Sequence, residues 1–375
     1  MTSQPVVSVV MAVYNGKEFL REAIESILDQ TFRNFEFVII NDGSVDGTDA
    51  ILDDYARLSA HLRVYRQSNQ GLITSLNTAC QLARGTYIAR MDADDIAFPD
   101  RLERQVSFLM THANVAVLGG AAQVIDRSGR PISLIRYPTT NSEIKAALFT
   151  YSCFVHPTVM MSKDAFLALG GYRKPFLHAE EYDLWLRMAE RYELGNLADP
   201  VLYYRVHPQQ ITTSHLEQQV VSALGARAAA CVRQTTGRDP FSNTDVVNQQ
   251  LLHQLGLDAR LINKSLIQAF LFVANRMLEA DADEVAFRFV KQALARSGTS
   301  YISKSTFADL YWGIAAQQYQ KGHWVRCLRP LLCACLMQPW RVRTLAKTHL
   351  YKFLGLCRKA CSLRLARWPK SRRRC

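Results

Sequence analysis

The sequence lacks two glycine-rich phosphate loops that are common in α/β proteins. The turn after the first apolar run is "YNGKEF", which does not contain G-x-G-x-x-G, and G-x-x-x-x-G-K is absent from the chain. The first motif holds a dinucleotide pyrophosphate at a helix N-terminus, and the second cradles nucleotide phosphates. Their absence argues against a dinucleotide-dependent oxidoreductase and against a P-loop enzyme.

Paired cysteines, a long apolar run and a leader-like N-terminus are also missing. The nine cysteines form no C-x-x-C pair, which favours a reducing compartment over a disulfide framework. The start, "MTSQPVVSVVMAVYNG", has no basic segment before its apolar run. The stretch "CLRPLLCACLMQPW" is too short to span a bilayer and contains Arg329 and Pro330. We therefore expect a globular cytoplasmic protein.

Acidic residues are absent from the last 35 positions. Residues 341–375 contain twelve Lys and Arg and no Asp or Glu, which equals the formal net charge of +12 for the whole chain. Leu, Phe, Tyr and Trp alternate with these basic residues at helical intervals, as in an amphipathic helix on an anionic membrane surface. A solvated tail and a nucleic-acid contact are the alternatives, and we expect no specific nucleic-acid partner.

Strand-like and helix-like runs alternate over the first 120 residues. The apolar runs 6–14, 35–42, 62–67 and 85–92 have the length and composition of buried strands, and amphipathic runs at 17–30, 47–58 and 72–83 separate them. Asn15 and Thr48 are placed to cap the first two helices. This alternation of strands and helices predicts an α/β fold with a doubly wound, mostly parallel sheet, followed by a helical C-terminal region.

Three segments are expected along the chain, because 375 residues exceed what one compact core usually needs. Residues 1–220 contain the sheet. Residues 221–340 are helical, and the stretch 307–339 resembles a tetratricopeptide-like hairpin with Gly322 in its turn and Pro339 at its end. Residues 341–375 form the basic tail.

Polar residues follow each predicted strand, and the fourth strand ends in "DADD". Asp92, Asp94 and Asp95 repel one another unless a cation neutralises them. Mg2+ or Mn2+ takes oxygen ligands and keeps positions open for phosphate oxygens. The Asp-x-Asp pair therefore predicts a metal bridge to a nucleoside diphosphate. A solvated acidic turn is the alternative, and Asp95 is equally compatible with a helix cap or a loop support.

Four motifs in order resemble glycosyltransferase family 2. They are "VSVVMAVYNGKEFLREAIESILDQTF", "FEFVIINDGSVDGT", "NQGLITSLNTACQLARGTYIARMDADD" and "HAEEYDLWLRM", and the similarity covers about residues 5–215. The resemblance implies a GT-A fold, an inverting mechanism and Mg2+ or Mn2+ as cofactor.

The resemblance also implies roles for individual residues. Asp42 would bind the nucleotide base, and Asp94 would ligate the metal together with Asp92. Further donor-binding positions are Ala12, Tyr14, Asn15, Asn69, Gly71, Arg90, Asp92 and Ala93. In the second acidic motif the family's base is an aspartate that follows a glutamate. Glu181 stands there in this chain, so the base is Glu181 or Glu180.

Elementary chemistry agrees with two separate acidic sites. A metal stabilises charge on a departing diphosphate, and a carboxylate accepts the proton of the attacking hydroxyl. The alternative for Glu180 and Glu181 is a helix N-terminus that carries carboxylates for electrostatic reasons. Related enzymes sometimes use a histidine at the position of His207 as a metal or phosphate ligand, so the resemblance makes His207 a candidate metal ligand, and a loop residue is the alternative. His156, in "CFVHPTVMM", resembles a common element of the family and is expected to support the acceptor site, and Trp185 is expected to belong to the core rather than to stack on a sugar.

These observations predict a metal-dependent hexosyltransferase-type glycosyltransferase. We expect a nucleotide-sugar donor, with UDP as the leading carrier, and a surface glycan or lipid-linked oligosaccharide as acceptor. The basic tail would bring the enzyme to the inner face of the cytoplasmic membrane. A nucleotidyltransferase, and a noncatalytic nucleotide-sugar or nucleic-acid binding protein, are the alternatives.

Overall fold

The computed structural model describes residues 4–297 together with Tyr311 and Ala315. The chain divides into two compact units, residues 1–282 and 283–375, which we describe separately. The predicted hairpin at 307–339, apart from Tyr311 and Ala315, and the basic tail at 341–375 lie outside the described residues.

Four parallel strands form one half of the sheet in the first unit. Their order is β3-β2-β1-β4, and their bounds are β1 (Val7–Val13), β2 (Phe35–Asn41), β3 (Leu62–Arg66) and β4 (Tyr87–Arg90). β1 and β2 are buried almost throughout, as expected for strands covered on both faces. All four strands match the runs that the sequence predicts.

The other half of the sheet is mixed. The order continues β4-β8-β6-β9-β5, with β7 added to β6. β6 and β9 pair in parallel, while β8, β5 and β7 each pair antiparallel to their neighbours. The bounds are β5 (Ile96–Ala97), β6 (Val115–Ile125), β7 (Pro131–Ile135), β8 (Met160–Ser162) and β9 (Glu193–Arg205).

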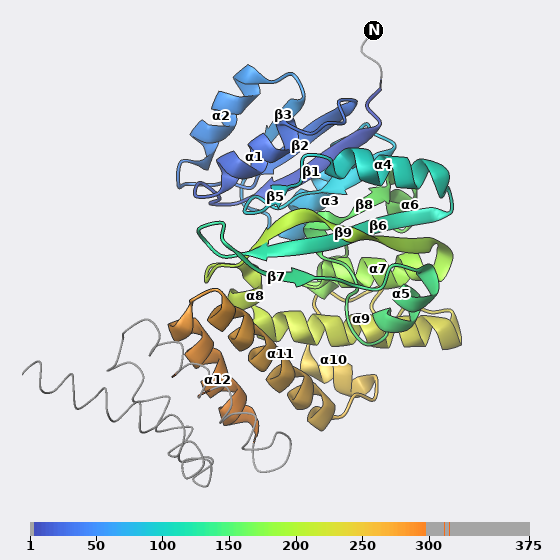
Figure 1. Cartoon of the computed structure of the whole chain (residues 1–375). Helices are drawn as coiled ribbons and strands as arrows, with labels where there is room; N and C mark the ends of the chain where they lie inside the picture. Colours follow the sequence, from blue (N-terminus) through green and yellow to red (C-terminus); the bar gives the residue numbers. More distant parts are fainter. Residues whose placement is uncertain (1–3, 298–310, 312–314, 316–375) are drawn as a thin grey trace, which may run out of the picture. The chain divides into compact units, whose positions relative to one another are not determined.

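Helices cover both faces of this sheet (Figure 1). On one face of the sheet, buried side chains of the strands form a hydrophobic core with α1 (Leu20–Leu28), α2 (Thr48–Leu58) and α4 (Arg101–Thr111). α3 (Leu72–Leu82) contacts β1 and β2 but contributes no residue to that core. The α/β prediction is therefore confirmed. The amphipathic runs form helices because apolar residues recur on one side of each, as Leu20, Ala23, Ile24 and Ile27 do in α1.

The two predicted caps are wrong. Phe19 occupies the N-cap of α1, and the Asn15 side chain instead accepts a hydrogen bond from the Val45 backbone 2.9 Å away. Thr48 is the first helical residue of α2, and its Oγ1 accepts from the Gly16 backbone. Both polar side chains connect two loops at the sheet edge, an interaction between distant segments that local capping rules do not predict.

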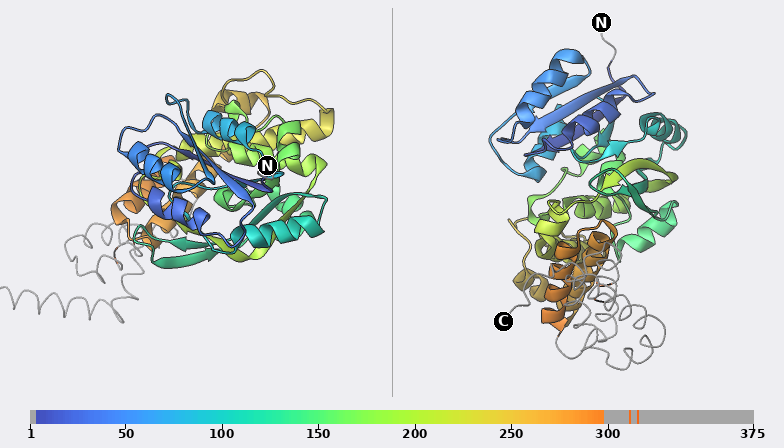
Figure 2. Two further views of the ribbon diagram at one scale, coloured as in Figure 1. Left: turned by 90° about the horizontal axis from the view of Figure 1, so that it is seen from above. Right: turned by 60° about the vertical axis from the view of Figure 1, so that its left-hand side comes forward.

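The remaining helices of the first unit follow the sheet. They are α5 (Asn141–Leu148), α6 (Lys163–Ala168), α7 (Glu180–Arg191), α8 (Ile211–Ser214), α9 (Leu216–Thr236), α10 (Gln249–Gln254) and α11 (Ala259–Glu279), with single 3-10 turns η1 (His156–Thr158) and η2 (Lys174–Phe176). α9 packs against α7, α10 and α11 (Figure 2). The predicted domain boundary at residue 220 therefore falls inside α9.

The second unit contributes α12 (Asp283–Ser297) to the described structure. With α9 to α11 it makes the C-terminal region helical, as predicted. Over the described part of the chain, no helix is both long enough and apolar enough to cross a membrane.

Candidate active site

The carboxyl ends of β1 and β2 are joined by their loops. The Asn15 backbone donates to Ser44 Oγ over 2.9 Å, and the Val45 backbone donates back to Asn15 Oδ1. Asn15 has a φ of 53°, a left-handed conformation that asparagine tolerates well. Beside it, Ala12 is half-buried and Tyr14 is 53% exposed. The three residues predicted to bind base and ribose therefore share one edge.

Asp42 organises the loop that follows β3. Its Oδ1 accepts hydrogen bonds from Gln67 Nε2 and the Gln70 backbone, both at 2.8 Å, and its Oδ2 accepts from the Gly71 backbone at 2.9 Å. The carboxylate is 3% exposed. Asp42 thus holds residues 67–71 at the sheet edge, a role that the sequence does not reveal; its contact with a nucleotide base stays a prediction.

The same loop approaches Gly43. This residue has a φ of +77°, and a Cβ there would lie 2.9 Å from the Asn69 backbone nitrogen. A side chain at position 43 would therefore strain the backbone and displace Asn69. The predicted donor residues Asn69 and Gly71 are placed next to Asp42 by this close approach.

The aspartates after β4 form one cluster with His207. Oxygen atoms of Asp92, Asp94 and Asp95 lie within 4.8 Å of one another. His207 Nε2 lies 3.0 Å from Asp94 Oδ2, and the Arg205 backbone donates to Asp95 Oδ1 over 2.8 Å. The structure thus brings together the predicted metal residues and adds Asp95, which holds the end of β9 and does not cap a helix.

This cluster has the chemistry of a hard-cation site. Asp95 is 1% exposed, and its Oδ2 is buried without a hydrogen-bond partner. Burial and the neighbouring Asp94 raise the pKa of Asp95 well above its usual range, and burial raises that of Asp92. A carboxylate oxygen without a hydrogen-bond partner, among three carboxylates and an imidazole, fits Mg2+ or Mn2+, because a cation would neutralise the repulsion between the carboxylates.

Arg90 lies between the two acidic sites. Its guanidinium is 1% exposed, donates from Nη2 to Asp92 Oδ1 over 2.6 Å, and has a buried Nε without a partner. Its positive charge lowers the pKa of both Asp92 and Glu180, against the larger opposing effect of burial. One buried cation therefore acts on both sites.

Glu180 and Glu181 form the second acidic site at the start of α7. Burial raises the pKa of Glu180 to about 7, and burial together with Glu180 raises that of Glu181 to about 8. Glu180 is 2% exposed and its Oε2 has no hydrogen-bond partner, whereas Glu181 is half-buried. A carboxylate with a raised pKa that keeps contact with solvent suits proton transfer near neutral pH.

Ion pairs fix the helix that carries this pair. Asp183 is fully buried, and its Oδ2 accepts from Arg173 Nε and Arg187 Nε, both at 2.9 Å. Arg173 also binds Asp239, in the loop after α9. Asp183 is therefore a structural anchor of α7, although it belongs to the same acidic motif as Glu181.

His156 and Trp185 lie close to the glutamate pair. A ring nitrogen of His156 and carboxylate oxygens of Glu180 and Glu181 lie within 4.8 Å of one another. Trp185 is fully buried and its ring meets that of His156 edge-on, with centroids 6.0 Å apart, so Trp185 is a core residue. The sequence analysis missed Tyr172, whose hydroxyl lies 2.9 Å from His156 Nε2; a tyrosine after two glycines carries no signal for this contact.

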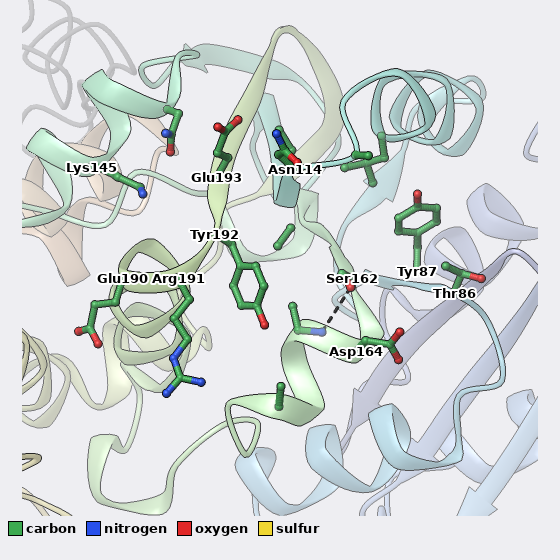
Figure 3. A pocket seen from close by; sticks show the side chains of 17 residues that line it. Thr86, Tyr87, Asn114, Lys145, Ser162, Asp164, Glu190, Arg191, Tyr192 and Glu193 are labelled. Carbon is green, nitrogen blue, oxygen red and sulfur yellow. Dashed lines mark hydrogen bonds between the residues drawn. The ribbon is translucent and has the colours of Figure 1, made fainter.

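A separate pocket of about 740 Å³ opens at the opposite edge of the sheet (Figure 3). It lies at the first residues of β4, β6 and β9, and Tyr87, Lys145, Asp164 and Tyr192 are among its lining residues. None of the predicted site residues lines it, so the pocket and the clustered acids are different places.

The part of the chain that contains most of the sheet resembles known proteins. The family model described as Glycosyl transferase family 2 matches residues 8–170. EpsE of Bacillus subtilis (strain 168) is 39% identical over 207 residues, which cover 54% of this chain and 73% of the relative. The O-antigen biosynthesis glycosyltransferase WbnJ of Escherichia coli is 34% identical and is covered to 84%, with 56% of this chain aligned.

Two further similarities agree. The amylovoran biosynthesis glycosyltransferase AmsE of Erwinia amylovora is 33% identical over 53% of this chain and 75% of its own length. Among solved structures, residues 1–349 of TarS from S. aureus, in complex with UDP-GlcNAc, superpose with a TM-score of 0.50 at 17% identity, over 84% of this chain and 92% of that one. At that identity the likeness concerns the fold alone.

Proposed function

Because the chain belongs to glycosyltransferase family 2, we propose that it transfers a sugar from a nucleoside diphosphate donor to a glycan hydroxyl with inversion at the anomeric carbon. The observation that carries the proposal is the pairing of two acidic sites, Asp92 to Asp95 with His207, and Glu180 with Glu181, around the buried Arg90. Such a transfer needs one site for the leaving diphosphate and one for the attacking hydroxyl.

The donor would lie along the carboxyl ends of β1, β2 and β4. Ala12, Tyr14 and Asn15 would contact base and ribose, beside the loop that Asp42 holds. Asp92, Asp94 and His207 would hold a divalent cation, which would stabilise the negative charge on the departing nucleoside diphosphate. Arg90 would add positive charge at the same place.

Glu181 is the base in this proposal. It keeps some exposure to solvent, whereas Glu180 is 2% exposed behind it. Glu181 would accept the proton of the acceptor hydroxyl as that oxygen attacks the anomeric carbon from the face opposite the diphosphate. Glu180 would keep the pKa of Glu181 high through its charge.

The acceptor is proposed to be a hydroxyl of a surface polysaccharide or a lipid-linked oligosaccharide. The names of WbnJ and AmsE, which refer to O-antigen and amylovoran biosynthesis, support this class. The basic residues of 341–375 support contact with an anionic membrane at its cytoplasmic face. Binding of the full chain to vesicles of anionic lipid, lost on truncation after residue 340, would test that contact.

Donor binding and hydrolysis are the direct test of the activity. The full chain is titrated with UDP-, TDP- and GDP-sugars in the presence of Mg2+, Mn2+ or EDTA, and Asp94→Ala is compared with Asp199→Ala, whose side chain is 83% exposed. We expect one donor to bind and hydrolyse only with metal, and only Asp94→Ala to abolish this. Absence of binding to every donor with either metal contradicts the proposal.

A further inference from the structure

His156 connects the glutamate pair to a fixed tyrosine. Its Nε2 lies 2.9 Å from Tyr172 Oη, and one of its ring nitrogens belongs to the 4.8 Å cluster with Glu180 and Glu181. Edge-on contacts with Trp185 and Tyr172, at centroid distances of 6.0 and 5.5 Å, fix the plane of the imidazole. The ring therefore presents a defined polar edge to the carboxylates, within reach of a single bridging water.

Tyr172 is itself held by α3, the helix that follows the loop at residues 67–71. The Tyr172 backbone donates to Asn77 Oδ1 over 3.0 Å, and Asn77 Nδ2 donates to the Tyr172 carbonyl over 2.8 Å. Asn77 lies in α3, which starts directly after Gly71. A chain of hydrogen bonds thus leads from α3, next to the loop that Asp42 holds, through Tyr172 to His156.

Gly171 permits this close approach. A Cβ at position 171 would lie 2.7 Å from Asn77 Oδ1 and 2.9 Å from the ring of Phe166, and the backbone φ there is +69°. The Tyr172 ring packs edge-on against Phe166 with a centroid distance of 5.3 Å. The hydroxyl of Tyr172 is therefore positioned by backbone hydrogen bonds and by packing together.

We propose that His156 and Tyr172 are positioning residues that orient the carboxylate of Glu181 for proton transfer. This inference rests on the proposed function, in which Glu181 is the base. A glutamate has one more rotatable bond than an aspartate, so fixing its carboxylate costs more conformational entropy. In this proposal His156, which Tyr172 holds and which lies within the 4.8 Å cluster with the two glutamates, restricts that freedom.

The charge states of the pair suit this role. Burial, and then the charge of Arg90, lower the pKa of His156 well below its usual range, so the imidazole is neutral. Burial raises the pKa of Tyr172 well above its usual range, so the phenol keeps its proton. The proposed role requires the tautomer in which the Tyr172 hydroxyl donates to Nε2, because the imidazole then carries its proton on Nδ1 and is a hydrogen-bond donor without adding positive charge.

The test compares Tyr172→Phe, His156→Leu and His156→Gln with Tyr87→Phe in the full-length chain. Tyr87 starts β4 at the opposite edge of the sheet, so its variant is the matched control. The measured quantities are kcat and KM for metal-dependent donor hydrolysis as a function of pH, and the Tm of each variant.

We expect Tyr172→Phe and His156→Leu to lower kcat about 10- to 100-fold while KM for the donor changes less than about twofold. In His156→Leu the acid limb of the kcat profile moves to higher pH, because the carboxylate loses a donor that stabilises its charged form. In Tyr172→Phe the limb moves in the same direction by less, because His156 keeps its N–H and loses only the hydroxyl that orients it. His156→Gln keeps an N–H donor and recovers part of kcat. Should Tyr172→Phe fail to fold, the two His156 variants make the same comparison.

Two results overturn the inference. In the first, the wild type hydrolyses a donor, but the Tyr172 and His156 variants have the kcat and the acid limb of Tyr87→Phe, or lose only donor affinity. The positioning role is then wrong, while the proposed function stands. If the wild type hydrolyses no donor with either metal, the proposed function fails and this inference fails with it.

Discussion

His207 Nε2 lies 3.0 Å from Asp94 Oδ2, although 113 positions separate the two residues. The pairing of the two-residue strand β5 with the end of β9 brings these residues together. In that pairing Ile96 lies opposite Tyr203 and Ala97 opposite Leu202. The Arg205 backbone then donates to Asp95. The antiparallel pairing therefore brings the chain after β9 to the aspartates that precede β5.

A change at His207 tests whether this contact matters for metal binding. We expect His207→Ala to raise the Mn2+ concentration needed for half-maximal donor hydrolysis about 10- to 100-fold, with a smaller effect at saturating metal, because one proposed ligand is lost and the carboxylates of Asp92 and Asp94 remain. Metal titration of the hydrolysis rate measures this. His253→Ala, on α10, is the control, and an unchanged titration in His207→Ala would exclude His207 as a ligand.

If Glu181 is the base, as proposed, its raised pKa sets the pH dependence of donor hydrolysis. A base is active when deprotonated, and burial together with Glu180 raises this pKa to about 8. We therefore expect kcat/KM for donor hydrolysis to fall about tenfold per pH unit below this value and to level off above it. A pH–rate profile at saturating Mg2+ measures this limb. A limb near pH 4.5 would mean that the base is an ordinary exposed carboxylate.

The sequence predicts the strands and the local acidic motifs because their information is local. β1 to β4 are continuous apolar runs bounded by polar turns, and Asp92 to Asp95 are adjacent in the chain. Their convergence at one edge follows from parallel strand geometry alone.

Contacts between distant segments are not predictable in this way. The short strand β5, the clamp of Asn77 on Tyr172, and the loop bonds of Asn15 depend on which residues the finished fold brings together. The N-cap predictions fail for the same reason, since each polar side chain accepts a hydrogen bond from the backbone of another loop.

The proposed function gives the two glutamates different roles, which conservative variants separate. We expect Glu181→Gln to lower kcat for donor hydrolysis about 100-fold or more with an unchanged donor Kd, because the base is lost. Glu180→Gln is expected to lower kcat less, and to move the acid limb to lower pH, since removing the charge of Glu180 lowers the pKa of Glu181. The opposite ranking of the two variants would make Glu180 the base.

Asp183 belongs to the same motif but is predicted to affect stability. Its carboxylate is fully buried between Arg173 and Arg187, so Asp183→Asn leaves two guanidinium groups without their shared anion. Loss of one partner from a buried ion pair costs about 3–5 kcal/mol. Urea unfolding of the full chain measures this free energy, and Asp54→Asn is the matched control.

Asp54 also contacts two arginines, Arg21 and Arg57, but its side chain is 45% exposed. Solvent screens such pairs, so we expect Asp54→Asn to change the free energy of unfolding by less than about 1 kcal/mol. A loss in Asp183→Asn no larger than in Asp54→Asn would contradict the anchoring role. Donor hydrolysis, measured below the unfolding transition, should then distinguish the two carboxylates. Asp183→Asn keeps an acid limb near that of the wild type, whereas Glu181→Gln turns over about 100-fold or more slowly and has lost that limb.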